Sequence, residues 1–474
     1  MFILNDWKKF NKIIEYRWEA LLFLFLLILL IILSPTNYLI ICLTILALAF
    51  IVWLNFNLNW GLYLLALTFP FINWQIYLIK DLNAPPVDWL GLALLIAFLL
   101  YLIRIKGFKQ VKLPLLFYFT LFLVVVIVSI WQSYFWEIGL KYLLRPYLFC
   151  YLIYLVLPTN IIKSEKILWR VIAVIYLISL LVASLSLVDY LFFTTASSGL
   201  NRLIPFSFGH FQPLGSNQNL LAELLVLAAP LGTLLGLKTY ERQKLKAKLI
   251  LGSVVFLTAI LLLTLSRAGW LVLLFQLVFI WLIIWPKIPD RILWQHKMKK
   301  FFRRYLWLFL LLSLTLVFLM LQLLTGPIAA SSDANRLLQW KIGLDMLEFN
   351  PLFGTGPGSF MEILNRDPYF QYEFGANLDA HGLVLKFLSE SGILGFSIFI
   401  LFLSAILGRA VRILIKLKSS SQEFLILVFL LLASSSAVLF QLFNTSYLTA
   451  KMWLPLGILT AATYLYERRI YEKN

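Results

Sequence analysis

The sequence predicts an all-α, polytopic transmembrane bundle of about 12–14 spans. Of its 474 residues, 62% are hydrophobic and only 13% are charged, and the mean hydropathy is +0.91. A water-soluble globule of this composition would have too few polar residues to cover its surface. Apolar runs long enough to cross roughly 30 Å of hydrocarbon recur from one end of the chain to the other. We therefore expect one integral membrane domain over residues 1–474.

The apolar runs follow one another with mostly short connections. The predicted spans cover approximately residues 19–34, 38–54, 59–77, 87–103, 113–131, 139–157, 171–193, 219–237, 249–265, 268–285, 305–325, 392–408, 424–442 and 452–466. No cleavage site of the A-x-A type follows the first run, so we expect it to be a retained anchor. Cys42 and Cys150 both fall inside spans, which favours small core residues over a disulfide or a metal site.

The basic residues predict the orientation. Most of the 40 Lys and Arg residues lie near seven clusters that fall on one side if the N-terminus is cytoplasmic: "DWKKFNK", "RIKGFKQVK", "KSEKILWR", "KTYERQKLKAK", "PKIPDRILWQHKMKKFFRR", "RAVRILIKLK" and "YERRIYEK". The positive-inside rule then predicts that both termini are cytoplasmic. The net charge of +18 thus indicates orientation near anionic lipid, and we expect no nucleic-acid partner.

Two outward connections are long, residues 194–218 and residues 326–391. The second is acidic where the cytoplasmic side is basic. Its stretch "NRLLQWKIGLDMLEF" spaces apolar residues three or four apart, which predicts an amphipathic surface helix. "NPLFGTGPGSF" then predicts a break, and "HGLVLKFLSESG" predicts a second short helix. A long loop with internal structure is usually functional, so we expect the active site there.

Arginines on the outer side are informative because the insertion bias works against them. Arg267, in "LSRAGW", lies in the tight turn between two spans, and Arg336 and Arg202 lie in the two long loops. Lys141 and Arg145 lie one helical turn apart, hence on one face, where a structural role is the simpler interpretation. Guanidinium groups match phosphate oxygens in pairs, so a lipid-linked pyrophosphate is a natural ligand for such a set.

His381 and Asp379 lie just ahead of an apolar segment in a chain with only three histidines. If Asp379 caps the helix that follows, its carboxylate accepts backbone N–H bonds and His381 lies in the first turn. The imidazole would then titrate near neutrality, as a general base for a hydroxyl should. His296 lies in a basic cytoplasmic loop and His210 has no evident partner. No His/Cys pair has metal-ligand spacing, so we expect no metal and no cofactor.

The remaining sequence features are weaker candidates for functional residues. "GTGPGSF", residues 354–360, has no Gly-Lys-Ser/Thr after it and is better interpreted as a turn than as a nucleotide loop. Glu223 is an acid inside a predicted span and is therefore a candidate substrate-binding residue. Asn217 and Asn219, at the start of the same span, are candidates of the same rank.

In their order, "LSRAGW", "NRLLQWKIGLDMLEFNPLFGTGPGSF" and "AHGLVLKFLSESGILGF" resemble the core of the O-antigen ligase and O-antigen polymerase superfamily, and "GSNQNLLAELLVLAAP" resembles that family's Asn-containing entry to a span. The resemblance implies a metal-independent, inverting glycosyltransferase of the bacterial inner (plasma) membrane, with its active site on the periplasmic face. The donor would be a glycan on undecaprenyl pyrophosphate, and the acceptor a hydroxyl of a glycan, lipid or protein. By motif position, Arg267, Arg336 and Arg202 would bind pyrophosphate, with Arg145 as a further candidate, and His381 would activate the acceptor.

The sequence departs from the family pattern at two points. Family members commonly have His-Asn where this chain has His381 followed by Gly382, and the stretch from Arg202 to Asn217 is longer than the pattern. Two other classes of protein stay open. A transporter for an anion such as bicarbonate, or for a lipid-linked sugar, should show inverted repeats and charges at mid-membrane. A non-catalytic partner of an export machine would leave the outer Arg and His residues unexplained.

Overall fold

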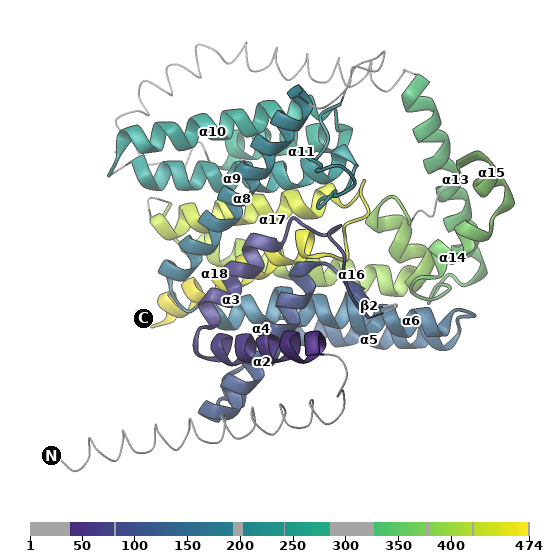
Figure 1. Ribbon diagram of the computed structural model, residues 1–474, viewed down its shortest axis with the longest axis horizontal. Coiled ribbons are helices and arrows are strands. Elements are labelled where there is room, and N and C mark those ends of the chain that lie inside the picture. Colours follow the sequence, from purple (N-terminus) through teal and green to yellow (C-terminus); the bar gives the residue numbers. More distant parts are fainter. Residues whose placement is uncertain are drawn as a thin grey trace.

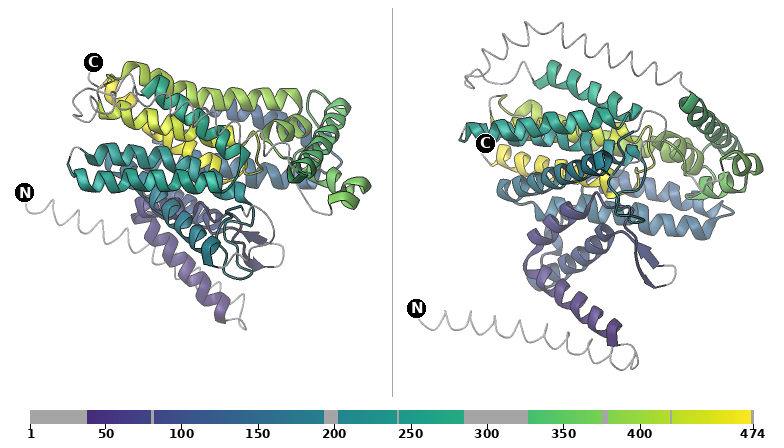
Figure 2. Two further views of the ribbon diagram at one scale, coloured as in Figure 1. Left: turned by 90° about the horizontal axis from the view of Figure 1, so that it is seen from above. Right: turned by 45° about the horizontal axis from the view of Figure 1, so that its top comes forward.

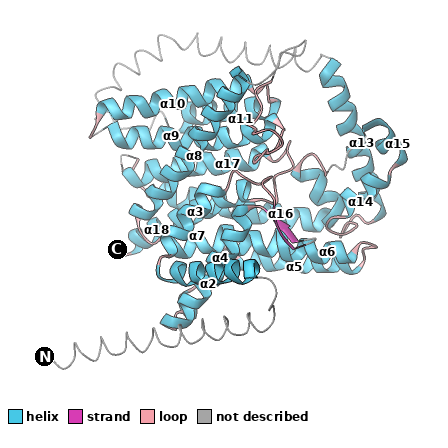
Figure 3. Ribbon diagram, viewed as in Figure 1, coloured by secondary structure: helices cyan, strands magenta, loops and turns pink. Residues whose placement is uncertain are grey.

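A computed structural model of the protein describes residues 38–79, 82–192, 202–240, 242–284, 327–374, 379–419 and 421–472 (Figure 1). Almost all of this part of the chain is helical, with one short hairpin (Figure 3), and the predicted all-α polytopic fold is confirmed. The elements are α2 (Tyr38–Phe56), α3 (Leu58–Thr68), β1 (Ile76–Ile79), β2 (Leu82–Ala84), α4 (Pro86–Ile105), η1 (Phe108–Gln110), α5 (Leu116–Trp131), α6 (Trp136–Tyr142), η2 (Leu143–Val156), α7 (Leu157–Ile161), α8 (Glu165–Phe192), α9 (Gln218–Tyr240), α10 (Lys244–Leu263), α11 (Arg267–Phe279), η3 (Ile280–Ile284), α13 (Pro327–Phe349), α14 (Ser359–Arg366), α15 (Pro368–Phe374), α16 (Leu383–Lys416), α17 (Gln422–Phe440) and α18 (Ala450–Tyr471).

Seven helices in the described part are long and apolar enough to cross a membrane. They are α4, the continuous helix from α6 through η2 to α7, α8, α9, α10, α16 and α17. Each matches a predicted span, and α5 and α11 match two more as shorter apolar helices. The predicted spans 19–34 and 305–325 lie outside the described residues. The protein is therefore a multi-pass membrane protein.

The predicted span 59–77 differs from the structure. Helix α3 ends at Thr68, and the chain then turns into the antiparallel hairpin β1–β2. Pro70 explains the end of the helix, because proline has no backbone N–H to donate to the carbonyl four residues earlier and its ring clashes with that carbonyl. The part of α2 from Thr44 meets α3 at 116°, so the two form either a broken span or a re-entrant loop.

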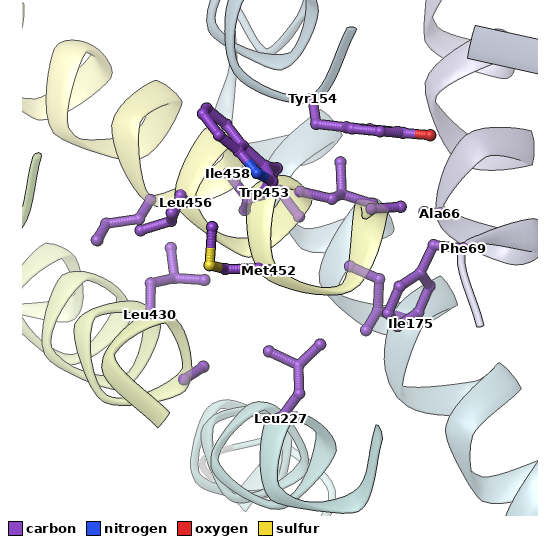
Figure 4. Close-up of a cluster of buried hydrophobic side chains, with 14 of the residues drawn as sticks. Ala66, Phe69, Tyr154, Ile175, Leu227, Leu430, Met452, Trp453, Leu456 and Ile458 are labelled. Carbon is purple, nitrogen blue, oxygen red and sulfur yellow. The ribbon is translucent and has the colours of Figure 1, made fainter. Parts of the chain in front are cut away.

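Helix α18 lies at the centre of the bundle (Figure 4). Its Met452, Trp453 and Leu456 point among side chains of α3, η2, α8, α9 and α17. The indole N–H of Trp453 donates to the carbonyl of Tyr447 at 3.0 Å, which satisfies its polar atom in the core. At Gly457, an added Cβ would lie 1.8 Å from the carbonyl oxygen of Tyr154, so only glycine lets α18 approach η2 this closely.

Helices α13–α15 lie at the end of the bundle opposite the C-terminal end of α18 (Figures 1 and 2). They share a small core with the start of α16, to which Ile342, Met346, Phe360 and Leu385 contribute. The predicted amphipathic helix is part of α13, and the predicted turn is built on three glycines with positive φ, namely Gly354, Gly356 and Gly358. Helix α16 kinks at Gly392, where the sequence predicts the change from a surface helix to a span.

Candidate active site

Four segments meet at this end of the bundle: the loop 202–217, the turn between α10 and α11, residues 379–382, and the loop 441–449 between α17 and α18 (Figure 1). Backbone contacts join them in pairs. The N–H of Leu203 donates to the carbonyl of Leu263 at 3.1 Å, and the N–H of Leu383 donates to the carbonyl of Gln441 at 2.9 Å. Residues far apart in sequence thus build one site.

His381 lies directly before Gly382, the N-cap of α16. Its backbone N–H donates to Oε1 of Gln339 on α13 at 2.9 Å. Its Nδ1 is buried and has no hydrogen-bond partner among the described residues. At Gly382, φ is 121° and an added Cβ would lie 2.6 Å from the carbonyl of Leu442. The close approach of the loop 441–449 therefore explains why this chain has glycine after the histidine.

The expectation that Asp379 caps α16 is wrong. The helix is capped by the backbone at Gly382, and the carboxylate of Asp379 instead accepts the N–H of Ala380 at 2.8 Å and Nζ of Lys386 at 2.7 Å. The left-handed backbone at Gly382 separates residue 379 from the first turn of the helix. His381 consequently precedes the helix rather than lying in its first turn.

The pKa of His381 is lowered from its usual value of about 6.5. Burial has the largest effect, because it disfavours the charged imidazolium, and the Arg336 guanidinium lowers the pKa further. The carboxylate of Asp379 acts in the opposite direction and is outweighed. The imidazole is therefore neutral at pH 7 and available to accept a proton.

Arg336 and Gln339 lie one helical turn apart on α13, so the same helix face carries a guanidinium and the contact to His381. The amide of Gln339 is fixed because its Nε2 donates to Oδ1 of Asn335 at 2.7 Å. That bond leaves Oε1 for the N–H of His381. Gln339 is fully buried, and the sequence pattern gave no signal for it beyond its place beside Arg336.

A buried ionic network lies behind the histidine. Nζ of Lys386 contacts Asp379 at 2.7 Å and Glu390 at 2.8 Å, and both Lys386 and Glu390 are almost completely buried. Oε1 of Glu390 also accepts the N–H of Phe360 at 3.1 Å. The network thus ties the glycine-rich turn to α16. The i,i+4 spacing of Lys386 and Glu390 in an apolar segment was a signal for it.

Arg202, Arg267 and Asn219 form a second group. Arg267 is the first residue of α11, directly after the N-cap Ser266, whose hydroxyl donates to Oδ1 of Asn219 at 2.7 Å. The contact of Leu203 with Leu263 holds Arg202 beside the same turn. Asn219 is joined to Asn217, because its N–H donates to Oδ1 of Asn217 at 2.8 Å.

Asn217, Arg145 and Asp379 line one cavity of about 600 Å³, which we call the central cavity. Its wall also includes Lys141, Asp88 and residues of the loop 441–449. Nη2 of Arg145 lies 3.4 Å from Asp88, so this guanidinium is partly committed to a protein carboxylate. The central cavity therefore contacts both groups of residues. Asp379 belongs to the group around His381, and Asn217 belongs to the group around Arg267.

Glu223 is buried and is not among the residues that line this cavity. Its carboxylate accepts Nε2 of Gln441 at 2.6 Å and Nδ2 of Asn444 at 3.2 Å, and it lies 3.4 Å from Nζ of Lys451. Glu223 thus anchors the loop 441–449, whose Tyr447 donates its hydroxyl to the carbonyl of Ala380 at 3.2 Å. Within the described residues, no three His, Cys, Asp or Glu side chains are grouped so that they could hold a metal ion.

Fold and site together define a multi-pass membrane protein with a central cavity lined by Arg145, Asn217 and Asp379 and with a neutral histidine, His381, two residues after Asp379. Residues 252–400 match the family model described as O-antigen ligase, and the matched segment contains Arg267, Arg336 and His381. This segment, about a third of the chain, is therefore similar to the O-antigen ligase and polymerase superfamily. No curated protein matches the chain.

Proposed function

We propose that the protein transfers a glycan from undecaprenyl pyrophosphate to an acceptor hydroxyl on the periplasmic face, without a metal and with inversion. His381 takes the proton of the acceptor hydroxyl, whose oxygen attacks the anomeric carbon. The bond from that carbon to the pyrophosphate oxygen breaks, and undecaprenyl pyrophosphate leaves. Arg267, Arg336 and Arg202 offset the negative charge that develops on the leaving group.

The observation that carries this proposal is the position of His381 near Arg336, whose guanidinium lowers the pKa of the imidazole, and next to Asp379, which lines the central cavity. The same cation that lowers the pKa of the imidazole can bind the leaving pyrophosphate. A neutral base and a fixed cation are therefore available together, as an acid–base displacement with an anionic leaving group requires. Arg145 and Asn217 line the cavity and provide further contacts to the donor.

The arrangement of basic residues supports the proposed orientation. Lys112, Lys163 and Arg468, from three of the predicted cytoplasmic clusters, line one cavity together. They gather near the C-terminal end of α18, which lies opposite α13–α15 (Figure 2). By the positive-inside rule, this arrangement supports a cytoplasmic position for that end and the proposed periplasmic position for His381.

The test is transfer from a purified undecaprenyl-pyrophosphate-linked glycan by the purified full-length protein in EDTA. We expect the lipid-linked glycan to be consumed and undecaprenyl pyrophosphate to be released in equal amount. Proteoliposomes are tested in parallel for uptake of bicarbonate and for movement of the lipid-linked sugar. Uptake without donor consumption would overturn the proposal in favour of a transporter.

A further inference from the structure

A second cavity, of about 750 Å³, lies between the turn from α5 to α6 and the helices α13 and α14. We call it the lateral cavity. It shares no lining residue with the central cavity. Its size falls in the range of small-molecule sites. None of its lining residues takes part in the proposed transfer step.

The polar groups of the lateral cavity suit hydroxyl groups rather than phosphate. The lining contains two carboxylates, Asp345 and Asp367, against one guanidinium, Arg366. That guanidinium lies over the ring of Phe135 at 5.0 Å and 3.8 Å from Glu362. A phosphate would meet an excess of negative charge in this lining, whereas carboxylates are strong acceptors for the hydroxyl groups of a neutral ligand.

Amide and aromatic groups complete the lining. Nδ2 of Asn350 donates to Oε1 of Gln132 at 2.8 Å, so these two amides bridge α5 and α13 at the cavity wall. Tyr134 is 90% exposed and Phe349 is 76% exposed. Aromatic faces beside fixed polar groups suit a ligand whose surface is apolar on one side and hydroxylated on the other, as a sugar ring is.

A hydrogen bond joins the wall of the lateral cavity to the segment that carries the buried ionic network. The lining residue Thr355 donates its N–H to the carbonyl of Ser389 at 3.0 Å, next to Glu390 of the buried ionic network. On α13, Asp345 follows Gln339 by six residues, which is about 9 Å along a helix. This separation along the helix is within the reach of a short oligosaccharide.

We infer that the lateral cavity binds a neutral oligosaccharide segment of a glycan whose end reacts at His381. The carboxylate of Asp345 accepts hydrogen bonds from sugar hydroxyl groups, and the ring of Tyr134 covers a sugar face. Such a subsite would retain the growing or incoming chain by contacts remote from the reacting bond. The assignment rests on the proposed function for the identity of the glycan, but its test measures binding alone.

The test is calorimetric titration of the full-length protein in detergent with oligosaccharide released by mild acid from the lipid-linked pool. A second titration uses a dephosphorylated, neutral outer-core oligosaccharide of lipopolysaccharide, which separates a donor glycan from an acceptor glycan. We expect Tyr134→Ala and Asp345→Asn each to weaken binding of one of these probes by about tenfold. His381→Ala should leave that binding intact while transfer is lost.

Matched controls are available on helices α13 and α15. Tyr372→Ala changes a tyrosine of α15 that is 88% exposed, and Glu348→Gln changes an exposed carboxylate of α13; neither lines the cavity. Both should bind as the wild type does.

Binding that is absent in the wild type, or unchanged in Tyr134→Ala and Asp345→Asn, would overturn the inference. So would a loss of co-purified phospholipid without a loss of sugar binding, since the aromatics would then be membrane-interface anchors. Dependence of binding on Tyr134 without any transfer would support the cavity and contradict only the proposed function.

Discussion

The backbone N–H of His381 donates to the side chain of Gln339 at 2.9 Å, and this bond connects the histidine to α13, the helix that carries Arg336. Helix α13 therefore positions both the proposed base, His381, and one proposed pyrophosphate-binding residue, Arg336. Movement of α13 would displace both. The relative position of base and cation is thus a property of this helix rather than of the loop alone.

Gln339→Leu should slow transfer by about tenfold to a hundredfold, because the substitution leaves a partly buried N–H without its acceptor and releases the histidine segment, at a cost of about 1–3 kcal/mol. Gln339→Glu retains an acceptor oxygen but loses the N–H that Asn335 accepts, so it should restore only part of the rate. The measurement is the turnover rate per folded molecule. Gln276→Ala, at a buried glutamine bonded to Val226 and Ser436, is the control for general destabilisation. An equal loss of rate in this control would contradict the prediction.

The pH profile of kcat/KM should fall on the acid side as His381 gains a proton, because only the neutral imidazole can act as a base. Burial and Arg336 lower the pKa of His381, so this fall lies below the usual range of a histidine. Arg336→Gln removes a cation and should move it to higher pH. Asp379→Asn removes an anion and should move it to lower pH. The exposed Glu373→Gln serves as the control, and shifts of the same sign in the two test variants would exclude His381 as the titrating group.

Lys386→Met should lower the free energy of unfolding by about 3–5 kcal/mol, because it leaves a buried carboxylate, Glu390, without its cation. The triple variant Asp379→Asn/Lys386→Met/Glu390→Gln should recover part of this loss, since it removes the charges together. Thermal unfolding in detergent measures both effects. Lys341→Met, at an exposed lysine of α13, should stay within about 0.5 kcal/mol of wild type. A triple variant less stable than Lys386→Met would contradict this prediction, because the uncompensated charge of Glu390 would then not explain the loss of stability.

Arg267→Lys should raise the Kd of the lipid-linked donor by about tenfold, because lysine keeps the charge but loses the paired donors of the guanidinium. The position of Arg267 at the start of α11 fixes its backbone, so the loss concerns the head group. Arg242→Lys, an exposed arginine in the turn between α9 and α10, is the matched control. Donor affinities that are equal in the two variants would remove Arg267 from the proposed site.

Periodicity and composition predicted most helices of the described part, because apolar length is the dominant constraint in a membrane. They also predicted the turn at residues 354–360 and the change at Gly392, where glycine and local charge are decisive. They missed the end of α3 at Thr68, since the apolar run continues past Pro70 into the turn before the hairpin. The central place of α18 was not predictable either, because its burial depends on neighbours from distant parts of the chain.

The sequence predicted individual residues of the site but not the contacts between them. Motif order indicated Arg336 and His381, and the structure places them close enough for the guanidinium to affect the imidazole. The role of Asp379 was misjudged, because its partner Lys386 lies seven residues away, beyond the reach of a simple capping pattern. Gln339 was invisible, since nothing in a sequence marks which buried amide meets a backbone N–H of another segment.

The most direct test of the account is single-turnover transfer by His381→Ala preloaded with the undecaprenyl-pyrophosphate-linked glycan in EDTA. His210→Ala, at an exposed histidine, is the matched control. The account predicts that His381→Ala binds the donor as the wild type does but transfers the glycan about 10²- to 10⁴-fold more slowly, the usual contribution of a general base. Transfer by His381→Ala at the wild-type rate would contradict it.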